Sequence, residues 1–190
     1  MKYVTILPVV LAMILAACAT PPTEEMNKAQ DAVTQAENDA NAVTFAPNTL
    51  VRARDSLTKM QEEANSKRYD AAKNFAADAI TNAEKAIADG KTGAARAREE
   101  AENLLNSLAG PLAETTSALD AAQKVNNIDL DFASLLRDLD TAKSNYDEAR
   151  QSLQANRYQD AIDKGQNVRS ILASINARLT DATQATFRKQ

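Results

Sequence analysis

Apolar side chains recur every three or four residues along most of this chain. In the C-terminal half, steps of three and four residues alternate, which gives an average period of 3.5. A repeat of this period places the apolar positions on one stripe of an α-helix and predicts helices that pack side by side. The positions are Leu135, Leu139, Ala142, Tyr146, Ala149 and Leu153, then Tyr158, Ala161, Gly165, Val168, Leu172, Ile175, Leu179 and Ala182.

The N-terminal half carries the same spacing with smaller side chains. Small side chains allow helix axes to approach closely, but each buries little apolar area. Helix length, helix propensity and a few larger anchors must therefore supply much of the stability there. The positions are Leu50, Ala53, Leu57, Met60 and Ala64, then Tyr69, Ala72, Ala76, Ala79, Ala83 and Ala86.

The two halves also match each other at an offset of 89 residues. Residues 68–72 read RYDAA and residues 157–161 read RYQDA. Apolar and small positions coincide over about 40 residues around these two stretches, which is the kind of self-similarity that indicates a repeat. We therefore expect two diverged copies of one helical unit, at 26–109 and 110–190.

Breaks in the pattern divide the chain into helices. Gly110-Pro111 predicts a stop and a restart, and Asp129 or Asp131 is a suitable N-cap. Gly90 and Gly93 leave open whether the preceding helix bends or continues. Short connections favour antiparallel neighbours, so the sequence predicts an all-α fold, an elongated antiparallel helical bundle. The expected helices span about 24–43, 48–66, 69–108, 131–155 and 157–187.

Composition agrees with this expectation. Alanine accounts for 38 of the 190 residues, while the chain has four glycines, five prolines and no tryptophan. Such a composition suits long helices and leaves few strand formers. The 22 basic and 26 acidic residues are interspersed, with a net charge of -4. Because no basic face stands out, we expect no nucleic-acid partner.

The first 18 residues differ from the rest of the chain. Met1-Lys2-Tyr3 carries one positive charge, and Val4–Ala17 is apolar apart from Thr5. About 14 apolar residues are too few to cross a bilayer but suit a signal peptide. Residues 1–17 are therefore expected to be a signal peptide.

The last residues of this segment, Leu15-Ala16-Ala17-Cys18, resemble the lipobox of bacterial lipoproteins. The resemblance implies cleavage between Ala17 and Cys18 and a diacylglyceryl group on the Cys18 sulfur. Several acyl chains on one residue meet the requirement for stable membrane anchoring. Because Ala19 rather than Asp follows the cysteine, the resemblance also implies an outer-membrane location facing the periplasm. Residues 18–25, which include Pro21-Pro22, are expected to be the tether.

Little in the chain suits catalysis. Histidine is absent, and the one cysteine is assigned to lipid, so the commonest bases, nucleophiles and metal ligands are missing. We therefore expect no enzymatic activity, no metal and no cofactor other than the lipid on Cys18. Tyr69 and Tyr158 recur at equivalent positions, and they are candidates for repeated interaction contacts or for anchors at the corner between two helices.

The stretch 26–101 is similar to a bacterial envelope family known as domain of unknown function number 4398. The resemblance implies an envelope location and supplies no catalytic residues. The residues that carry it are Ala29, Ala32, Phe45-Ala46-Pro47, Leu50, Ala53-Arg54, Leu57, Tyr69, Ala72, Ala76 and the alanines up to Ala86.

These observations lead to two functional hypotheses. In the first, the protein is a non-enzymatic, lipid-anchored envelope lipoprotein that acts as a helical scaffold, spacer or protein-interaction module. Its partners would be the membrane, through the lipid, and an unidentified envelope protein or a second copy of the chain. In the alternative, the protein is a periplasmic carrier that binds a lipid or another hydrophobic ligand between its helices.

Overall fold

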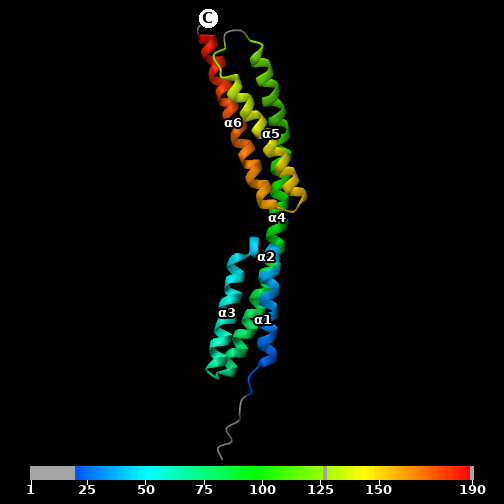
Figure 1. Cartoon of the computed structure of the whole chain (residues 1–190), viewed down its shortest axis with the longest axis vertical. Coiled ribbons are helices and arrows are strands. Elements are labelled where there is room, and N and C mark those ends of the chain that lie inside the picture. The colour runs from blue at the N-terminus through cyan, green and yellow to red at the C-terminus, as the bar shows by residue number, and fades with distance from the viewer. Residues whose placement is uncertain (1–19, 126–127, 189–190) are drawn as a thin grey trace, which may run out of the picture. The chain divides into compact units, whose positions relative to one another are not determined.

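The computed structural model describes residues 20–125 and 128–188, and they form six α-helices (Figure 1). The prediction of an all-α antiparallel bundle is confirmed. The helices are α1 (Thr23–Asn38), α2 (Ala40–Phe45), α3 (Pro47–Asn65), α4 (Tyr69–Gln123), α5 (Phe132–Gln154) and α6 (Tyr158–Arg188).

The helices belong to two compact units. Unit 1 contains the described residues up to 38 together with 48–86, and unit 2 contains residues 39–47 together with 87–188. Helix α4 contributes its first part to unit 1 and its remainder to unit 2. The predicted repeat boundaries, 26–109 and 110–190, concern sequence copies and stay a prediction.

Unit 1 packs α1, α3 and the first part of α4. Arg54 Nε of α3 lies 2.6 Å from Glu37 Oε1 near the end of α1, and Lys73 Nζ of α4 lies 3.7 Å from Glu25 Oε1 near the start of α1. Helices α1 and α4 therefore begin at the same end, and α3 runs antiparallel to them. The core is mostly alanine. The spacing predicted the members from α3 and α4, which are Leu50, Ala53, Leu57, Met60, Ala72, Ala76, Ala79, Ala83 and Ala86, and α1 adds Ala29, Val33 and Ala36.

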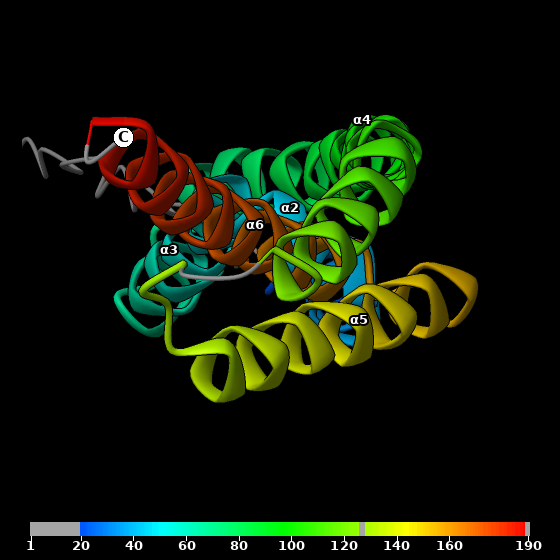
Figure 2. The ribbon, with the colours of Figure 1, turned by 90° about the horizontal axis from the view of Figure 1, so that it is seen from above.

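Unit 2 packs the rest of α4 against α5 and α6, which stand at the corners of a triangle in the end-on view of Figure 2. Thr115 of α4 and Asn176 of α6 hydrogen-bond at 3.0 Å, while Arg178 of α6 pairs with Asp138 of α5 at 3.2 Å. Larger side chains fill this core: Leu104, Leu105, Leu108, Leu119, Leu135, Leu139, Ile162, Val168, Leu172, Ile175 and Leu179, among smaller alanines.

The predicted stop at Gly110-Pro111 is wrong, because α4 continues through both residues to Gln123. Their side of the helix is exposed, so the proline ring meets no neighbouring helix. A glycine and a proline inside a helix cost about 4 kcal/mol relative to alanine. Burial of Leu108 and Leu119 on either side of the pair offsets this cost, since a buried leucine contributes roughly 1.5–3 kcal/mol.

Helix α4 also continues through Gly90 and Gly93, so these glycines mark close packing rather than a bend. A Cβ atom at Gly90 would lie 2.5 Å from the backbone nitrogen of Ala42, and one at Gly93 would lie 2.5 Å from Phe45 Cβ. Both contacts involve α2, the short helix of the same unit. Glycine at these two positions lets α2 approach the α4 backbone.

The first predicted helix, 24–43, is divided in two. Helix α1 ends at Asn38, and the Asp39 side chain accepts a 2.8 Å hydrogen bond from the Ala42 N–H as the N-cap of α2. Aspartate competes with the backbone in this way and therefore favours helix starts over helix interiors. Asp131, one of two predicted caps, accepts in the same manner from Ser134 N–H at 3.0 Å and starts α5.

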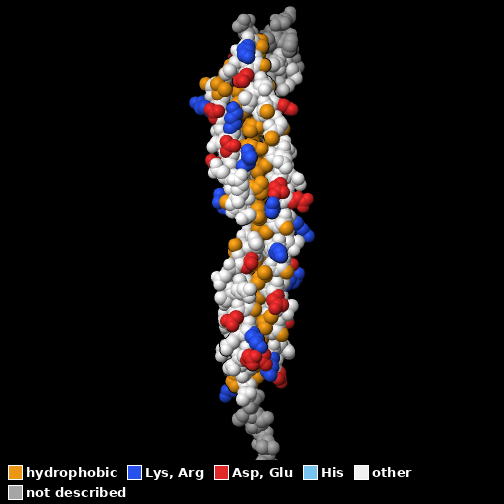
Figure 3. Space-filling model, turned by 90° about the vertical axis from the view of Figure 1, so that its right-hand side faces the viewer, with side chains coloured by type: hydrophobic (Ala, Val, Ile, Leu, Met, Phe, Trp, Pro, Cys, Tyr) orange, Lys and Arg blue, Asp and Glu red, His pale blue; other side chains and the backbone are white. Residues whose placement is uncertain are grey.

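Charged side chains occupy the outer faces of the helices. On the face seen in Figure 3, hydrophobic side chains follow narrow seams between helices, with blue and red side chains beside them. This is the surface expected of amphipathic helices whose apolar stripes face one another.

Candidate functional site

The predicted lipidation and cleavage residues, Ala17 and Cys18, lie outside the described residues. The structure begins beside them, at Thr20. The Thr23 N–H donates to the Pro21 carbonyl at 2.8 Å, the Met26 N–H donates to the Pro22 carbonyl at 3.0 Å, and Pro22 is buried. Helix α1 therefore takes up the last three residues of the segment predicted as the tether.

The turn between α3 and α4 reverses the chain through one residue in the left-handed conformation. Lys67 has a φ of 58°. Its N–H donates to the Ala64 carbonyl at 2.9 Å, and the Arg68 N–H donates to the Glu63 carbonyl at 2.9 Å. These are the two hydrogen bonds of a Schellman motif, which satisfies the last carbonyls of a helix.

The turn between α5 and α6 has the same backbone pattern 89 residues later. Asn156 also has a φ of 58°. Its N–H donates to the Leu153 carbonyl at 3.1 Å, and the Arg157 N–H donates to the Ser152 carbonyl at 2.9 Å. The two turns differ at the left-handed position, where asparagine is a favoured residue and Lys67 is an unusual one.

Side-chain contacts around the two turns are also different. In unit 1, the Arg68 guanidinium donates to the Glu63 carboxylate at 2.8 Å and lowers the pKa of Glu63 below its usual value. In unit 2, the buried Ser152 hydroxyl donates to Asp160, and this hydrogen bond is the main cause of the lowered pKa of Asp160. The backbone of the turn is thus shared, while its polar side chains are not.

The two tyrosines singled out in the sequence follow these turns directly. Tyr69 is the first residue of α4 in unit 1, and Tyr158 is the first residue of α6 in unit 2. Both are half-buried. The Tyr158 ring packs against the core of unit 2, and its hydroxyl donates to Asn156 Oδ1 at 2.8 Å. These positions suit corner anchors, and an interaction role for the two tyrosines stays a prediction.

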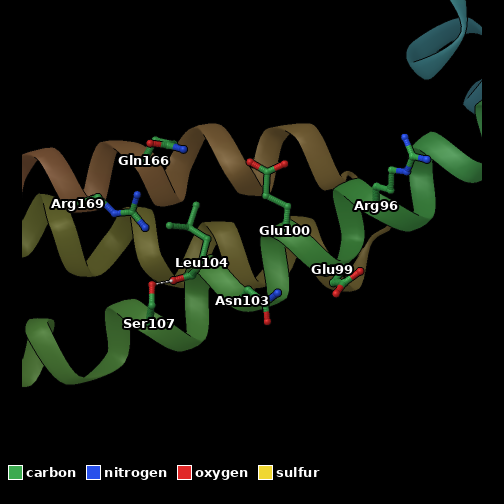
Figure 4. Close-up of a pocket in the computed structure, with 8 residues that line it drawn as sticks. All are labelled: Arg96, Glu99, Glu100, Asn103, Leu104, Ser107, Gln166 and Arg169. Carbon is green, nitrogen blue, oxygen red and sulfur yellow. Dashed lines mark hydrogen bonds between the residues drawn. The ribbon is translucent and has the colours of Figure 1, made fainter.

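A groove of about 500 Å³ runs between α4 and α6 of unit 2. Figure 4 shows Glu100 and Leu104 pointing from α4 toward α6, with Arg169 of α6 pointing toward Leu104. Arg96 and Glu99 lie along the same groove. Because two cations and two carboxylates line the groove, it suits a polar partner of mixed charge better than an apolar ligand.

A second groove of about 500 Å³, at the far end of the same two helices, is mostly apolar. It was not apparent from the sequence, because it depends on how the end of α4 meets the end of α6. Val125, which is 52% exposed, lies on its edge. The lining residues are Ala118, Ala121, Ala122, Val125, Ile128, Asn176, Leu179, Thr180 and Thr183.

Among 20–125 and 128–188, no helix combines the length and the apolar character needed to cross a membrane. No group of three or more acidic side chains in those ranges is arranged to hold a metal ion.

These features define an all-α protein of two helical units joined through one long helix. Residues 24–103 match the model of a family described as a domain of unknown function (DUF4398). This stretch of the chain therefore carries that domain, and the resemblance predicted over 26–101 is confirmed. No curated protein and no solved structure gives a significant match to the chain.

Proposed function

We propose that the protein is a non-enzymatic lipoprotein of the bacterial cell envelope, with a lipid on Cys18 that holds a helical scaffold at the membrane. The observation that carries this proposal is Leu15-Ala16-Ala17-Cys18 at the end of an apolar segment. The backbone hydrogen bonds accepted by Pro21 and Pro22, three and four residues after the cysteine, support it. Helix α1, which begins at Thr23, therefore lies within a few residues of the proposed lipid on Cys18.

Surface chemistry supports a role without catalysis. Glu24, Glu63, Glu148 and Asp160 are carboxylates with a lowered pKa, and for each of them the main cause is a hydrogen bond from a neighbouring side chain. Perturbed pKa values at catalytic sites instead arise where several groups share a cleft. The chain also contains no histidine.

We also infer that α3 with the start of α4, and α5 with α6, are diverged copies of one helical hairpin. The turns at Lys67 and Asn156 support this with the same hydrogen bonds and the same φ. Buried positions on both helices support it as well, since they coincide at an offset of 89 residues. Examples are Ala53 with Ala142, Met60 with Ala149, Ala79 with Val168, and Ala83 with Leu172.

In each unit, a third helix completes the hairpin. Helix α1 has this place in unit 1, and the later part of α4 has it in unit 2. The first part of α4 thus belongs to the hairpin of unit 1, and its later part is the third helix of unit 2. A duplicated hairpin that buries its own seams and exposes charged faces suits a scaffold or spacer that binds other envelope proteins.

Cell fractionation tests the anchor. The Cys18→Ser variant should leave the membrane fraction, because it has no thiol to receive the lipid, while Thr20→Ala should stay with the membrane as the wild type does. Ala19→Asp should move the protein from the outer to the inner membrane. A Cys18→Ser protein that stays membrane-bound through washing with salt and carbonate would refute the proposed anchor.

A carrier of hydrophobic ligands is the second candidate, favoured by the apolar groove between the ends of α4 and α6. Its volume of about 500 Å³ lies within the range of small-molecule sites. Native mass spectrometry of protein purified from its host envelope tests this function. A carrier should retain a co-purified lipid that Leu179→Arg displaces, and protein free of bound small molecules would argue against it.

A further inference from the structure

The end of unit 1 nearest the anchor consists of two segments that are distant in the sequence. One is the start of α1 at Thr23, and the other is the α3–α4 turn at Ser66–Arg68. The contact between Lys73 and Glu25 at 3.7 Å places the beginnings of α4 and α1 side by side. Figure 1 shows both segments at the same end of this unit.

The distance from the anchor to this end is limited by the length of the chain between them. Pro21 already accepts a hydrogen bond from Thr23, and Pro22 is buried. Only three residue steps separate Cys18 from Pro21. Even fully extended, three steps span about 11 Å. A lipid inserted at Cys18 would therefore hold the start of α1 close to the lipid headgroups.

We propose that the α3–α4 turn, Ser66–Arg68, is a membrane-contact surface that rests on lipid headgroups. This inference rests on the lipid anchor proposed above and adds the orientation of unit 1, with α1, α3 and α4 standing on the bilayer by this end. The matched α5–α6 turn, at Ala155–Arg157 in unit 2, has no anchor next to it in the sequence and serves as the internal comparison.

Lys67 is the residue whose chemistry suits this contact. It is exposed and holds the left-handed position that Asn156 holds in the matched turn. Lysine is less favourable than asparagine in this conformation, so the turn alone does not explain its presence. An ammonium group at the tip of the turn can meet lipid phosphates, and a basic residue near an anionic bilayer strengthens binding about fivefold.

The short connection to the anchor, rather than net charge, brings this end to the membrane. Glu62 and Asp70 place further carboxylates near the turn, so the end is not strongly basic. The other carboxylates at this end are held by basic side chains, in the ion pairs Lys28–Glu24, Lys73–Glu25 and Arg68–Glu63. We therefore expect contact with zwitterionic vesicles as well as anionic ones.

Lysine footprinting on vesicles tests the proposal. A chain of residues 18–190 is coupled through Cys18 to a maleimide lipid in phosphatidylcholine vesicles containing one-fifth phosphatidylglycerol. The reference is the same chain capped with N-ethylmaleimide in solution. Both are treated with a water-soluble acetylating reagent, and the modification of each lysine is measured by mass spectrometry. The Asn156→Lys variant provides a lysine in the same turn geometry in unit 2.

Anchoring should slow acetylation of Lys67 at least threefold and change acetylation at position 156 of the variant by less than 1.5-fold. An unchanged rate at Lys67 on chains that co-sediment with the vesicles would overturn the proposal, and so would equal protection at both positions. Because the lipid is attached chemically, this experiment tests the membrane contact whether or not the host lipidates Cys18. The mass of the native protein tests the lipidation separately.

Discussion

Units 1 and 2 bury the same pattern of positions with side chains of different size. Along the matched helices, Ala79 and Ala83 of α4 in unit 1 correspond to Val168 and Leu172 of α6 in unit 2. All four are at least nine-tenths buried. The spacing of apolar positions therefore determines which face of a helix is buried, and the size of the side chains is a separate variable.

The size of the buried side chains determines which interactions stabilise each unit. A buried leucine or isoleucine contributes roughly 1.5–3 kcal/mol through the hydrophobic effect, and an alanine contributes much less. Unit 1 instead relies on the high helix propensity of alanine and on a few large residues such as Met60, which is 2% exposed. Unit 2 should consequently be sensitive to truncation of its core, and unit 1 to enlargement of its core.

The largest effect is expected from truncating the core of unit 2. Ile175 is fully buried in α6, so Ile175→Ala should lower the free energy of unfolding by about 3 kcal/mol through lost burial and a cavity. Ser174→Ala, on the exposed side of the same turn, is the control. Urea unfolding monitored by circular dichroism measures both. A loss below 1 kcal/mol would mean that the larger side chains of unit 2 do not set its stability.

Pro111→Ala should have the next largest effect, in the opposite direction. Proline is about 3 kcal/mol less favourable than alanine inside a helix, while it restricts the unfolded chain by up to about 1 kcal/mol. Because Pro111 is exposed within α4, the substitution should raise the free energy of unfolding by about 2 kcal/mol. Thermal unfolding would show this gain, and a decrease in stability would contradict a continuous helix at this position.

Enlarging the core of unit 1 should be unfavourable although it adds apolar area. Ala83→Leu introduces the residue found at the matched position of unit 2, but Ala83 is 1% exposed in a closely packed seam. Overpacking should cost roughly 1 to 2 kcal/mol. Glu84→Leu, at the exposed neighbouring position, should change stability by less than about 0.5 kcal/mol. If Ala83→Leu stabilised the protein, the core of unit 1 would have room for a larger side chain at this position.

Exchanging the residues of the two turns should have a smaller effect. Lys67→Asn should raise stability by about 0.5 kcal/mol, because asparagine tolerates the left-handed conformation better than lysine. Asn156→Lys should lower it by a similar or larger amount, since it also removes the acceptor of the Tyr158 hydroxyl. Chemical denaturation of both variants tests this pair, and a loss of stability in Lys67→Asn or a gain in Asn156→Lys would show that the turns are not equivalent.

The smallest expected effect is on the pH dependence of stability. Arg68 lowers the pKa of Glu63 below its ordinary value of 4.5, so the folded state binds this proton less readily than the unfolded state. The resulting stability is present above about pH 4.5 and is lost as the pH falls through the lower pKa of the folded state. Glu63→Gln should flatten the acid limb of the melting temperature between pH 5 and 3, and an unchanged acid limb would contradict this contribution of the Arg68–Glu63 pair.

Much of the fold could be predicted from the sequence because the 3.5-residue period is long and regular. The core positions of α3, the start of α4, α5 and α6 follow from it, whereas the choice between Asp129 and Asp131 as the cap of α5 does not. The prediction of a stop at Gly110-Pro111 is wrong because both residues have poor helix propensity, whereas burial of Leu108 and Leu119 on either side keeps the helix continuous. The break at Asp39 was missed because a capping aspartate inside an apolar periodic stretch can equally lie on an exposed helix face.

The candidate surfaces were less predictable. The grooves between α4 and α6 depend on the register of two helices about 60 residues apart, as the Thr115–Asn176 contact shows, and periodicity does not fix that register. Of the two left-handed residues, only Asn156, which precedes Arg157-Tyr158, has a sequence signal, because asparagine is favoured in this conformation. Lys67 gave no such signal, since lysine is not typical of this conformation.

Intact mass measurement of the protein purified from its host membrane tests the central claim most directly. The account predicts a chain that begins at Cys18 and carries the mass of a diacylglyceryl group, with or without an additional acyl chain on the new amine. A chain with a free Cys18 thiol, or one that retains residues 1–17 without lipid, would contradict the proposed anchor and the membrane location that follows from it.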